Sequence, residues 1–150
     1  MKPDGWNHNV QYFDLLLSAV PRPCRRALDV GCGTGSFARQ LATIVDQVDA
    51  IDRDAGVVIR AREVSSGAGN LQFVQADFLT WARDGYDFIA IIAALHHMPF
   101  SHALERAAEL LRPGGVLAVL GLYRNHSVLD FMISGAALPV SWYCRLTSHP

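Results

Sequence analysis

The sequence has few cysteines and no long apolar run. Its 150 residues include three cysteines, which are scattered and lack the C-x-x-C spacing of many zinc and redox sites. We interpret them as reduced thiols of a cytoplasmic protein rather than as a disulfide framework or a metal site. The longest apolar stretches, such as residues 88–95, are far shorter than the ~18 residues that a membrane-spanning helix needs.

An excess of charge of one sign is also lacking. The sequence has 13 lysines and arginines against 14 aspartates and glutamates, so its formal net charge is −1. No segment is rich in lysine or arginine, and we therefore expect neither a nucleic acid nor a membrane as a partner. The polar start, MKPDGWNHN, lacks the apolar core of a signal peptide. We expect one cytoplasmic domain over residues 1–150, since domains commonly hold ~100–150 residues.

What the sequence does contain is an alternation of strand and helix patterns. Short apolar runs alternate with segments whose apolar residues recur at helical spacing, and Asp54 and Ser101 are suitable N-caps for two helices. This order predicts a Rossmann-like α/β fold, a doubly wound sheet with strands 1–5 parallel and helices on both faces. In such sheets, ligands bind beyond the carboxyl ends of the strands. The expected strands cover residues 27–30, 48–52, 71–75, 86–95 and 116–123.

The stretch LDVGCGTG places Gly31, Gly33 and Gly35 directly after the first expected strand. Their spacing is G-x-G-x-G, whereas the dinucleotide fingerprint is G-x-G-x-x-G. An acidic residue is expected about 20 positions after the first glycine, where it accepts hydrogen bonds from ribose hydroxyls. Asp52 fits this position, because 52 − 31 = 21. NAD-dependent enzymes and other nucleoside-binding proteins share this pattern, so it indicates a nucleoside without identifying it.

Two further carboxylates narrow the choice of ligand. Asp29 precedes the first glycine, where its charge would repel a pyrophosphate and favour an ammonium or sulfonium group. Asp77 follows the third expected strand, where it can accept a hydrogen bond from an adenine amino group. The ligand that these residues imply is an adenosine with a cationic, phosphate-free tail, which is S-adenosylmethionine.

With these motifs the chain resembles the class I SAM-dependent methyltransferases, and most of all the small bacterial enzymes called type 11 methyltransferases. LDVGCGTG, AIDRD, QADF, YDFIAIIAALHHM and LLRPGGVLAV occur in the order and spacing of that family. The resemblance covers roughly residues 6–125, and five ordered motifs are far more specific than any one of them. It implies an N-terminal helical cap over residues 6–20 and a core over residues 25–125.

The resemblance also implies roles for single residues. The glycine loop would lie along the methionine end of the cofactor, with Cys32 as a small residue beneath it. Asp52 would bind the ribose hydroxyls, and Arg53 would lie along the adenine. The adenine edge would be read by Asp77 and the backbone of Phe78, and the methionine amino group would contact the backbone near Ala93. An N-terminal segment would close over the site with His8 or Tyr12. The full implied set is Tyr12, Asp29, Gly31, Cys32, Gly33, Gly35, Asp52, Arg53, Asp77, Phe78 and Ala93.

The sequence names no catalytic residue and no metal ligand. His96 and His97 are candidates for a general base, but adjacent residues point apart, so at most one of them faces the site. Methyl transfer from a sulfonium needs alignment and a dry site more than a catalytic side chain. We therefore expect methyl transfer to a small-molecule acceptor. The alternatives are a SAM-binding protein or partner subunit with impaired catalysis, and an NAD-dependent oxidoreductase.

The end of the chain departs from the family pattern. The family's sheet has seven strands, the last two antiparallel, and we expect these two strands to be missing, with a C-terminal helical segment over residues 126–150. Roughly fifty to sixty residues of the usual fold would then be absent, on the ordinary size of such domains. The expected strand 116–123 would have an apolar free edge, which residues 134–144 or a second copy of the chain would cover.

Overall fold

The structure is a computed structural model that describes residues 12–65, 67–121 and 142–145. Five of the six strands of the sheet are parallel: β1 (Arg26–Val30), β2 (Gln47–Asp52), β3 (Leu71–Gln75), β4 (Tyr86–Ile92) and β5 (Leu111–Leu120). The helices are α1 (Phe13–Ser18), α2 (Ser36–Leu41), α3 (Ala55–Val64) and α4 (Phe100–Leu110), with short 3-10 turns η2 (Phe78–Thr80) and η3 (Leu95–His97).

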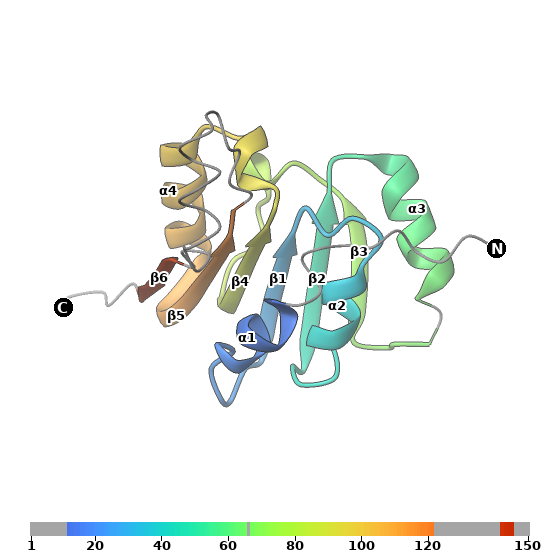
Figure 1. Cartoon of the computed structure of the whole chain (residues 1–150), viewed down its shortest axis with the longest axis horizontal. Coiled ribbons are helices and arrows are strands. Elements are labelled where there is room, and N and C mark those ends of the chain that lie inside the picture. Colours follow the sequence, from blue (N-terminus) through green and yellow to red (C-terminus); the bar gives the residue numbers. More distant parts are fainter. Residues whose placement is uncertain (1–11, 66, 122–141, 146–150) are drawn as a thin grey trace, which may run out of the picture.

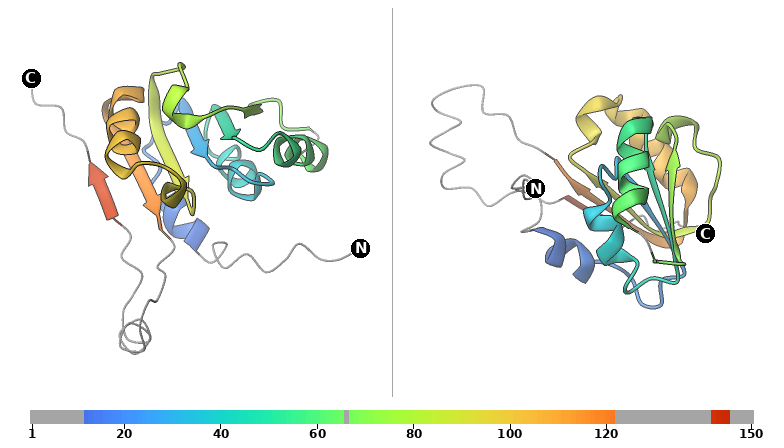
Figure 2. Two further views of the ribbon diagram at one scale, coloured as in Figure 1. Left: turned by 90° about the horizontal axis from the view of Figure 1, so that it is seen from above. Right: turned by 90° about the vertical axis from the view of Figure 1, so that its right-hand side faces the viewer.

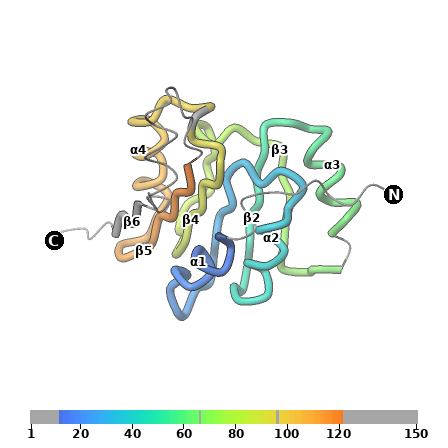
Figure 3. The backbone as a smooth tube through the Cα atoms, viewed as in Figure 1, coloured from blue at the N-terminus to red at the C-terminus, as the bar shows by residue number. Residues whose placement is uncertain are grey.

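The sheet has the order β3-β2-β1-β4-β5-β6, where β6 is Trp142–Arg145. The chain first builds outward from β1 to β3 and then crosses to the other side of β1 to form β4 and β5, a path that can be followed in Figure 3. The strand order therefore reverses between β1 and β4. At such a switch point the loops diverge and leave a crevice beyond the strand ends.

Apolar side chains fill both faces of the sheet. On one face, Ala27, Val48 and Phe88 pack with residues of α1, α2 and α3. On the other face, Leu28 and Ile89 pack with residues of α4 and η2. Because β1 and β4 are covered on both sides, they are the near-continuous apolar runs that a parallel sheet requires. Figure 1 shows α3 beside β3 and α4 beside β5, at opposite ends of the sheet, and Figure 2 gives two further views of this arrangement.

The predicted α/β class and parallel strands are confirmed, but one detail at the edge of the sheet is wrong. Residues Trp142–Arg145, which we expected within a helical segment, form the antiparallel strand β6 beside β5. The pairing matches Val116 with Arg145 and Val119 with Trp142, so it satisfies backbone groups of β5 that would otherwise lie on a free edge. At least one of the two antiparallel strands is therefore present, and it lies partly in the 134–144 segment that we proposed as a cover.

Helix boundaries follow local capping. Asp54 caps α3 as predicted, since its Oδ1 accepts hydrogen bonds from the backbone N–H groups of Gly56 and Val57 at 2.8 and 3.1 Å. Ser101 is not the cap of α4, because Pro99 holds that position and the helix begins at Phe100. Pro99 leaves no side-chain oxygen there, and its fixed φ suits the entry to a helix.

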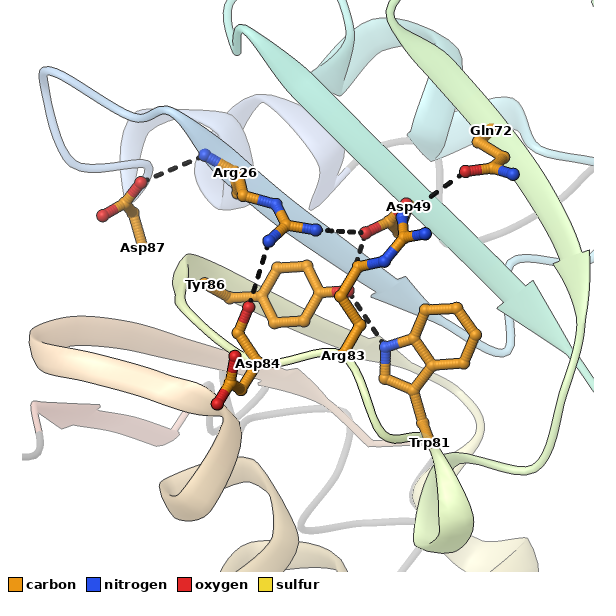
Figure 4. A network of polar contacts seen from close by, with 8 residues as sticks. All are labelled: Arg26, Asp49, Gln72, Trp81, Arg83, Asp84, Tyr86 and Asp87. Carbon is orange, nitrogen blue, oxygen red and sulfur yellow. Dashed lines mark hydrogen bonds and ion pairs between the residues drawn. The ribbon is translucent and has the colours of Figure 1, made fainter.

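A polar cluster lies at the amino-terminal end of the strands, on the face covered by α4 (Figure 4). The buried Asp49 accepts hydrogen bonds from Arg83 Nη1 at 2.7 Å and from the Tyr86 hydroxyl at 2.7 Å, and it pairs with Arg26 Nη2 at 3.4 Å. The Tyr86 hydroxyl in turn accepts a hydrogen bond from Trp81 Nε1 at 2.9 Å. This network satisfies a buried charge far along the strands from the crevice.

None of the helices in the described ranges is long and apolar enough to cross a membrane.

Candidate functional site

A cavity of about 620 Å³ opens beyond the carboxyl ends of β1, β2 and β4. Its walls come from the loop after β1, the end of β2, the start of η2, and the residues that follow β4. Of the residues predicted from the sequence, those that line it are Asp29, Gly31, Cys32, Gly33, Asp52, Arg53, Phe78 and Ala93. The switch point of the sheet therefore brings together residues that are up to 64 positions apart, since 93 − 29 = 64.

The first two glycines of the loop serve the cavity in different ways. Gly31 has φ +69°, and a Cβ there would lie 2.5 Å from the Cβ of Ala94, so only glycine lets the loop approach the chain after β4. Gly33 has φ +55°, and a Cβ there would meet no protein atom within 4 Å. Gly33 thus presents bare backbone to the cavity.

Gly35 has another purpose. With φ +80° it is the N-cap of α2, and a Cβ there would lie 2.5 Å from two ring atoms of Phe73 on β3. Gly35 does not line the cavity; it allows the loop to pack on β3. The structure therefore separates the third glycine from the first two, which spacing alone could not do.

Asp52 ends β2 and holds the glycine loop. Its Oδ2 accepts a hydrogen bond from the backbone N–H of Gly33 at 3.0 Å, and its Oδ1 accepts one from the N–H of Asp54 at 3.0 Å. Each carboxylate oxygen has two lone pairs, so both oxygens can accept a further hydrogen bond from a ligand.

Asp29 is the buried carboxylate of the cavity. The residue is 1% exposed, it lines the cavity, and its Oδ2 has no hydrogen-bond partner. Burial raises the pKa of Asp29 to about 7, the negative charge of Asp52 adds to the rise, and a backbone hydrogen bond from Ala38 opposes it. An unpartnered buried oxygen is costly, and a cationic ligand in the cavity would offset that cost.

Cys32 lies between the two glycines and is 8% exposed. Burial, together with the charges of Asp29 and Asp52, raises the pKa of its thiol well above the ordinary value. The thiol therefore stays protonated and is a poor nucleophile. This environment fits a small apolar residue in the cavity wall.

A family model described as a methyltransferase domain matches residues 27–115. This chain belongs to the methyltransferase-domain family. The match contains the glycine loop, Asp52 and the residues after β4, which form much of the cavity wall. The resemblance to class I SAM-dependent methyltransferases, predicted from the sequence, is confirmed.

Similar proteins include several methyltransferases. The uncharacterized methyltransferase Rv0089 of Mycobacterium tuberculosis is 40% identical over 118 residues, which cover 77% of this chain and 59% of that protein. Trans-aconitate 2-methyltransferase of Deinococcus radiodurans is 36% identical over 107 residues, covering 71% and 41% of the two chains. A 23S rRNA (uracil-C(5))-methyltransferase, RlmD of Stenotrophomonas maltophilia, is 30% identical over 131 residues, covering 77% and 30%. The chain thus spans less than two thirds of the length of these relatives.

Among solved structures, the N-methyltransferase NodS of Bradyrhizobium japonicum in complex with S-adenosyl-L-homocysteine superposes with a TM-score of 0.70 at 20% identity. The superposition covers 79% of this chain and 66% of NodS. At this identity the likeness concerns the fold alone.

Other predicted residues of this methyltransferase domain lie around the cavity rather than in it. Asp77 is not among the lining residues; its Oδ1 accepts a hydrogen bond from the N–H of Leu79 at 2.9 Å and caps η2. Tyr12 precedes α1 and packs against the apolar core on that side of the sheet, outside the lining. His8 lies outside the described residues.

Sequence reasoning missed the apolar part of the wall. Phe13 of α1 and Phe37 of α2 line the cavity, and their rings pack on each other with centroids 5.1 Å apart. Ile92 at the end of β4 and Met98 after η3 also line it. These residues lie in helical or strand patterns that read simply as core, so only the opening between the elements distinguishes them.

Two features after β4 complete the site. Ala93 has φ +54°, a left-handed conformation that is uncommon for a residue with a Cβ, and it lines the cavity. Of the two candidate histidines, His97 lines the cavity, whereas the side chain of His96 lies outside the described part of the structure. Within the described ranges, no group of three or more His, Cys, Asp or Glu residues is arranged to hold a metal ion.

Proposed function

We propose that this chain binds S-adenosylmethionine in the cavity and transfers its methyl group to a small, uncharged acceptor. One observation carries the proposal: two carboxylates, Asp29 and Asp52, line the same cavity as the bare backbone of Gly33, and the buried one has an unpartnered oxygen. This arrangement favours a cationic ligand that also offers hydroxyl donors.

The same carboxylates argue against a dinucleotide. A pyrophosphate beside Asp29 would add negative charge to a fully buried carboxylate, where the low dielectric strengthens repulsion. The glycine loop also lacks the spacing of the dinucleotide fingerprint, since Ser36 stands where its third glycine would be. An NAD-dependent oxidoreductase is therefore the less favourable alternative.

The residues present fit the proposed cofactor. Asp52 would accept hydrogen bonds from the ribose hydroxyls while it keeps its bond to Gly33. Asp29 would balance the positive charge, and the backbone near Ala93 would face the methionine end. When bound, S-adenosylmethionine supplies a methyl group on a cationic sulfur: an acceptor nucleophile bonds to the methyl carbon as the neutral thioether leaves, and neither a metal nor a covalent enzyme intermediate is required.

The chain itself would supply alignment and exclusion of water. Phe13, Phe37, Ile92 and Met98 make an apolar wall, and a dry wall strengthens the electrostatic interactions within the cavity. His97 lies in the same wall, where its imidazole could take a proton from an acceptor that must lose one.

The scarcity of cationic side chains in the cavity lining supports the proposal of a small, uncharged acceptor. Arg53 is the single lysine or arginine among the lining residues in the described ranges, and it pairs with Asp77. An anionic acceptor would thus lack a free counter-charge there. The relatives' names include both a small molecule, trans-aconitate, and a uracil of 23S rRNA, so the acceptor class is a proposal for this chain.

Calorimetry and product detection test the function. We expect S-adenosylmethionine and S-adenosylhomocysteine to bind with micromolar affinity, which is common for enzyme ligands. We expect no binding of NAD. Incubation with S-adenosylmethionine and a panel of neutral and anionic small molecules, with rRNA fragments as a further set, should yield S-adenosylhomocysteine only with the neutral small molecules. Binding without turnover would instead favour the non-catalytic SAM-binding alternative, and NAD binding that excludes S-adenosylmethionine would refute the proposal.

A further inference from the structure

Arg39 of α2 lies beside the glycine loop and binds it through its guanidinium group. Its Nη1 donates to the backbone carbonyl of Thr34 at 2.7 Å, and its Nη2 donates to the Ser36 hydroxyl oxygen at 3.4 Å. Thr34 and Ser36 line the cavity, whereas Arg39 does not. A change at Arg39 therefore reaches a ligand only through the loop.

The same guanidinium joins the loop to another helix. Nη1 of Arg39 also donates to Ser65 Oγ at 3.0 Å, across 26 positions of sequence. Ser65 is the C-cap of α3, where a cation interacts favourably with the carbonyl end of the helix. An arginine suits this position because its planar fork carries several donors in fixed directions. Since α3 packs into the core through Val58 and Ala61, the loop is anchored to a packed element.

The glycine loop needs such an anchor, because its backbone has unusual freedom. Gly31, Gly33 and Gly35 have the left-handed φ values +69°, +55° and +80°, and glycine moves readily between left- and right-handed conformations. The Asp52 carboxylate holds the loop at the N–H of Gly33 from the end of β2. A contact at one peptide leaves the following peptides able to rotate, so a second contact further along the loop is required to fix it.

Arg39 supplies this second contact at the peptide between Thr34 and Gly35. The carbonyl of this peptide accepts the hydrogen bond from Arg39, and its N–H, which belongs to Gly35, donates to the Cys32 carbonyl at 2.9 Å. Both polar groups of the peptide thus have partners, which fixes its plane. The guanidinium also lies close against it, since a Cβ at Gly35 would be 3.3 Å from Arg39 Nη1.

We propose that Arg39 is a positioning residue of the cofactor site, which holds the glycine loop in its binding conformation by tying the Thr34 carbonyl to the end of α3. Because the ligand in question is S-adenosylmethionine, this role rests on the proposed function. The apparent affinity of a ligand falls with the fraction of molecules that are in the binding conformation. Loss of the tie therefore weakens binding although no contact with the ligand is removed.

Calorimetry with S-adenosylhomocysteine and amide hydrogen exchange test this role together. The first variants are Arg39→Met, which keeps an apolar stem without the guanidinium, and Arg39→Lys, whose compact ammonium lacks the planar fork. Ser65→Ala removes only the anchor on α3. As a matched control, Arg60→Met changes an exposed arginine of α3 outside the cavity lining. Amide exchange reports local opening of the loop separately from opening of the sheet.

We expect Arg39→Met to weaken binding of S-adenosylhomocysteine by about tenfold, because losing a hydrogen bond from a charged donor shifts a local equilibrium by about that factor. Arg39→Lys should lose about threefold and Ser65→Ala about twofold, since each keeps part of the tie. Arg60→Met should bind as the unchanged chain does.

Amide exchange should show where the change occurs. In Arg39→Met without ligand, the Gly35 amide should lose most of its protection, while amides within β1 and β4 stay protected. Saturating S-adenosylhomocysteine should restore the protection of Gly35, because the ligand selects the binding conformation. A residue that served only the stability of the fold would change neither the affinity of folded molecules nor this local protection.

Three results would overturn the inference. Arg39→Met can bind within about twofold of the unchanged chain, its Gly35 amide can stay fully protected, or Arg60→Met can lose as much affinity, which would trace the effect to charge alone. If Arg39→Met does not fold, Arg39→Lys with unchanged affinity and protection would overturn it instead. If the unchanged chain does not bind S-adenosylhomocysteine, the proposed function fails and this role with it, whereas failure of the role alone requires an unchanged chain that binds.

Discussion

The carboxylate of Asp52 accepts a hydrogen bond from the backbone N–H of Gly33 at 3.0 Å, across 19 positions of sequence. The residue expected to bind the ribose and the glycine loop that faces the cavity therefore hold each other in place before any ligand is present. A site of this kind loses little conformational freedom on binding, which favours affinity.

Removing this carboxylate should weaken the cofactor site twice over. In Asp52→Ala, the ribose loses its acceptor and the N–H of Gly33 loses its partner. Because hydrogen bonds to charged groups contribute about 1.5–3 kcal/mol, we expect the affinity for S-adenosylhomocysteine to fall by a factor on the order of 10 to 100. Calorimetry measures the change. Asp46→Asn, an exposed carboxylate outside the cavity lining, is the control, and equal affinities in both variants would contradict the placement.

The two glycines of the loop should respond differently to an added methyl group. Gly33→Ala should cost about 1–2 kcal/mol of stability for its left-handed φ, and its Cβ should reduce ligand affinity. Gly35→Ala should have a similar backbone cost, and its new Cβ would also collide with the Phe73 ring at 2.5 Å. Its free energy of unfolding should therefore fall by about 1–3 kcal/mol more than that of Gly33→Ala. Urea unfolding and calorimetry distinguish the two effects. Equal stability losses in the two variants would contradict the separate roles.

Asp29 should make stability depend on pH. Its pKa is about 7 in the folded chain against 3.8 as an ordinary carboxyl, so between these values the folded state binds more protons than the unfolded state. Stability therefore falls as pH rises through this window, and the loss is complete above pH 7. Asp29→Asn removes this pH dependence. Its stability relative to the unchanged chain should therefore rise between pH 5 and pH 8, by up to about 3 kcal/mol, because about two pH units of the window lie above pH 5.

Urea unfolding of Asp29→Asn and the unchanged chain at both pH values checks this expectation, while calorimetry should show weaker binding of S-adenosylmethionine by the variant. A stability difference between the two proteins that is the same at pH 5 and pH 8 would show that Asp29 does not titrate in this window.

The polar cluster of Figure 4 should affect stability without affecting the site. Tyr86→Phe removes the donor to Asp49 and the acceptor of Trp81 Nε1, so we expect a loss of about 1–3 kcal/mol in the free energy of unfolding. The affinity for S-adenosylhomocysteine should stay within twofold, because the cluster lies at the opposite end of the strands from the cavity. Urea unfolding and calorimetry measure both, and a marked loss of affinity would contradict the separation.

Much of this domain follows from short-range signals. Residues 71–75 form a strand as their alternation predicts, and Asp54 caps α3 because a carboxylate before a helix meets free N–H groups. The long apolar run after residue 86 forms β4, since a strand buried on both faces has no polar side. These features depend on neighbours within a few residues or on periodicity, and both can be read along the chain.

Contacts between distant segments were not predictable in the same way. A side chain is excluded at position 35 because the ring of Phe73 on β3 lies against Gly35. Asp77 faces Arg53 because β2 and β3 end side by side. The pairing of β6 with β5 likewise joins distant residues, from Val119 with Trp142 (142 − 119 = 23) to Val116 with Arg145 (145 − 116 = 29). Spacing locates such residues at the ends of strands but says nothing about which side chain reaches the cavity.

The sequence by itself determined the alternation of strands and helices, the doubly wound class of the sheet, and the residue types that meet a nucleoside beyond its strand ends, because each depends on local chemistry and on the handedness of strand connections. Tertiary packing alone decided that Gly35 packs against Phe73 and that Phe13 and Met98 line the cavity. It also decided that Asp77 forms an ion pair with Arg53. A side chain's direction at a strand end is set by what packs against it, and those neighbours come from other parts of the chain.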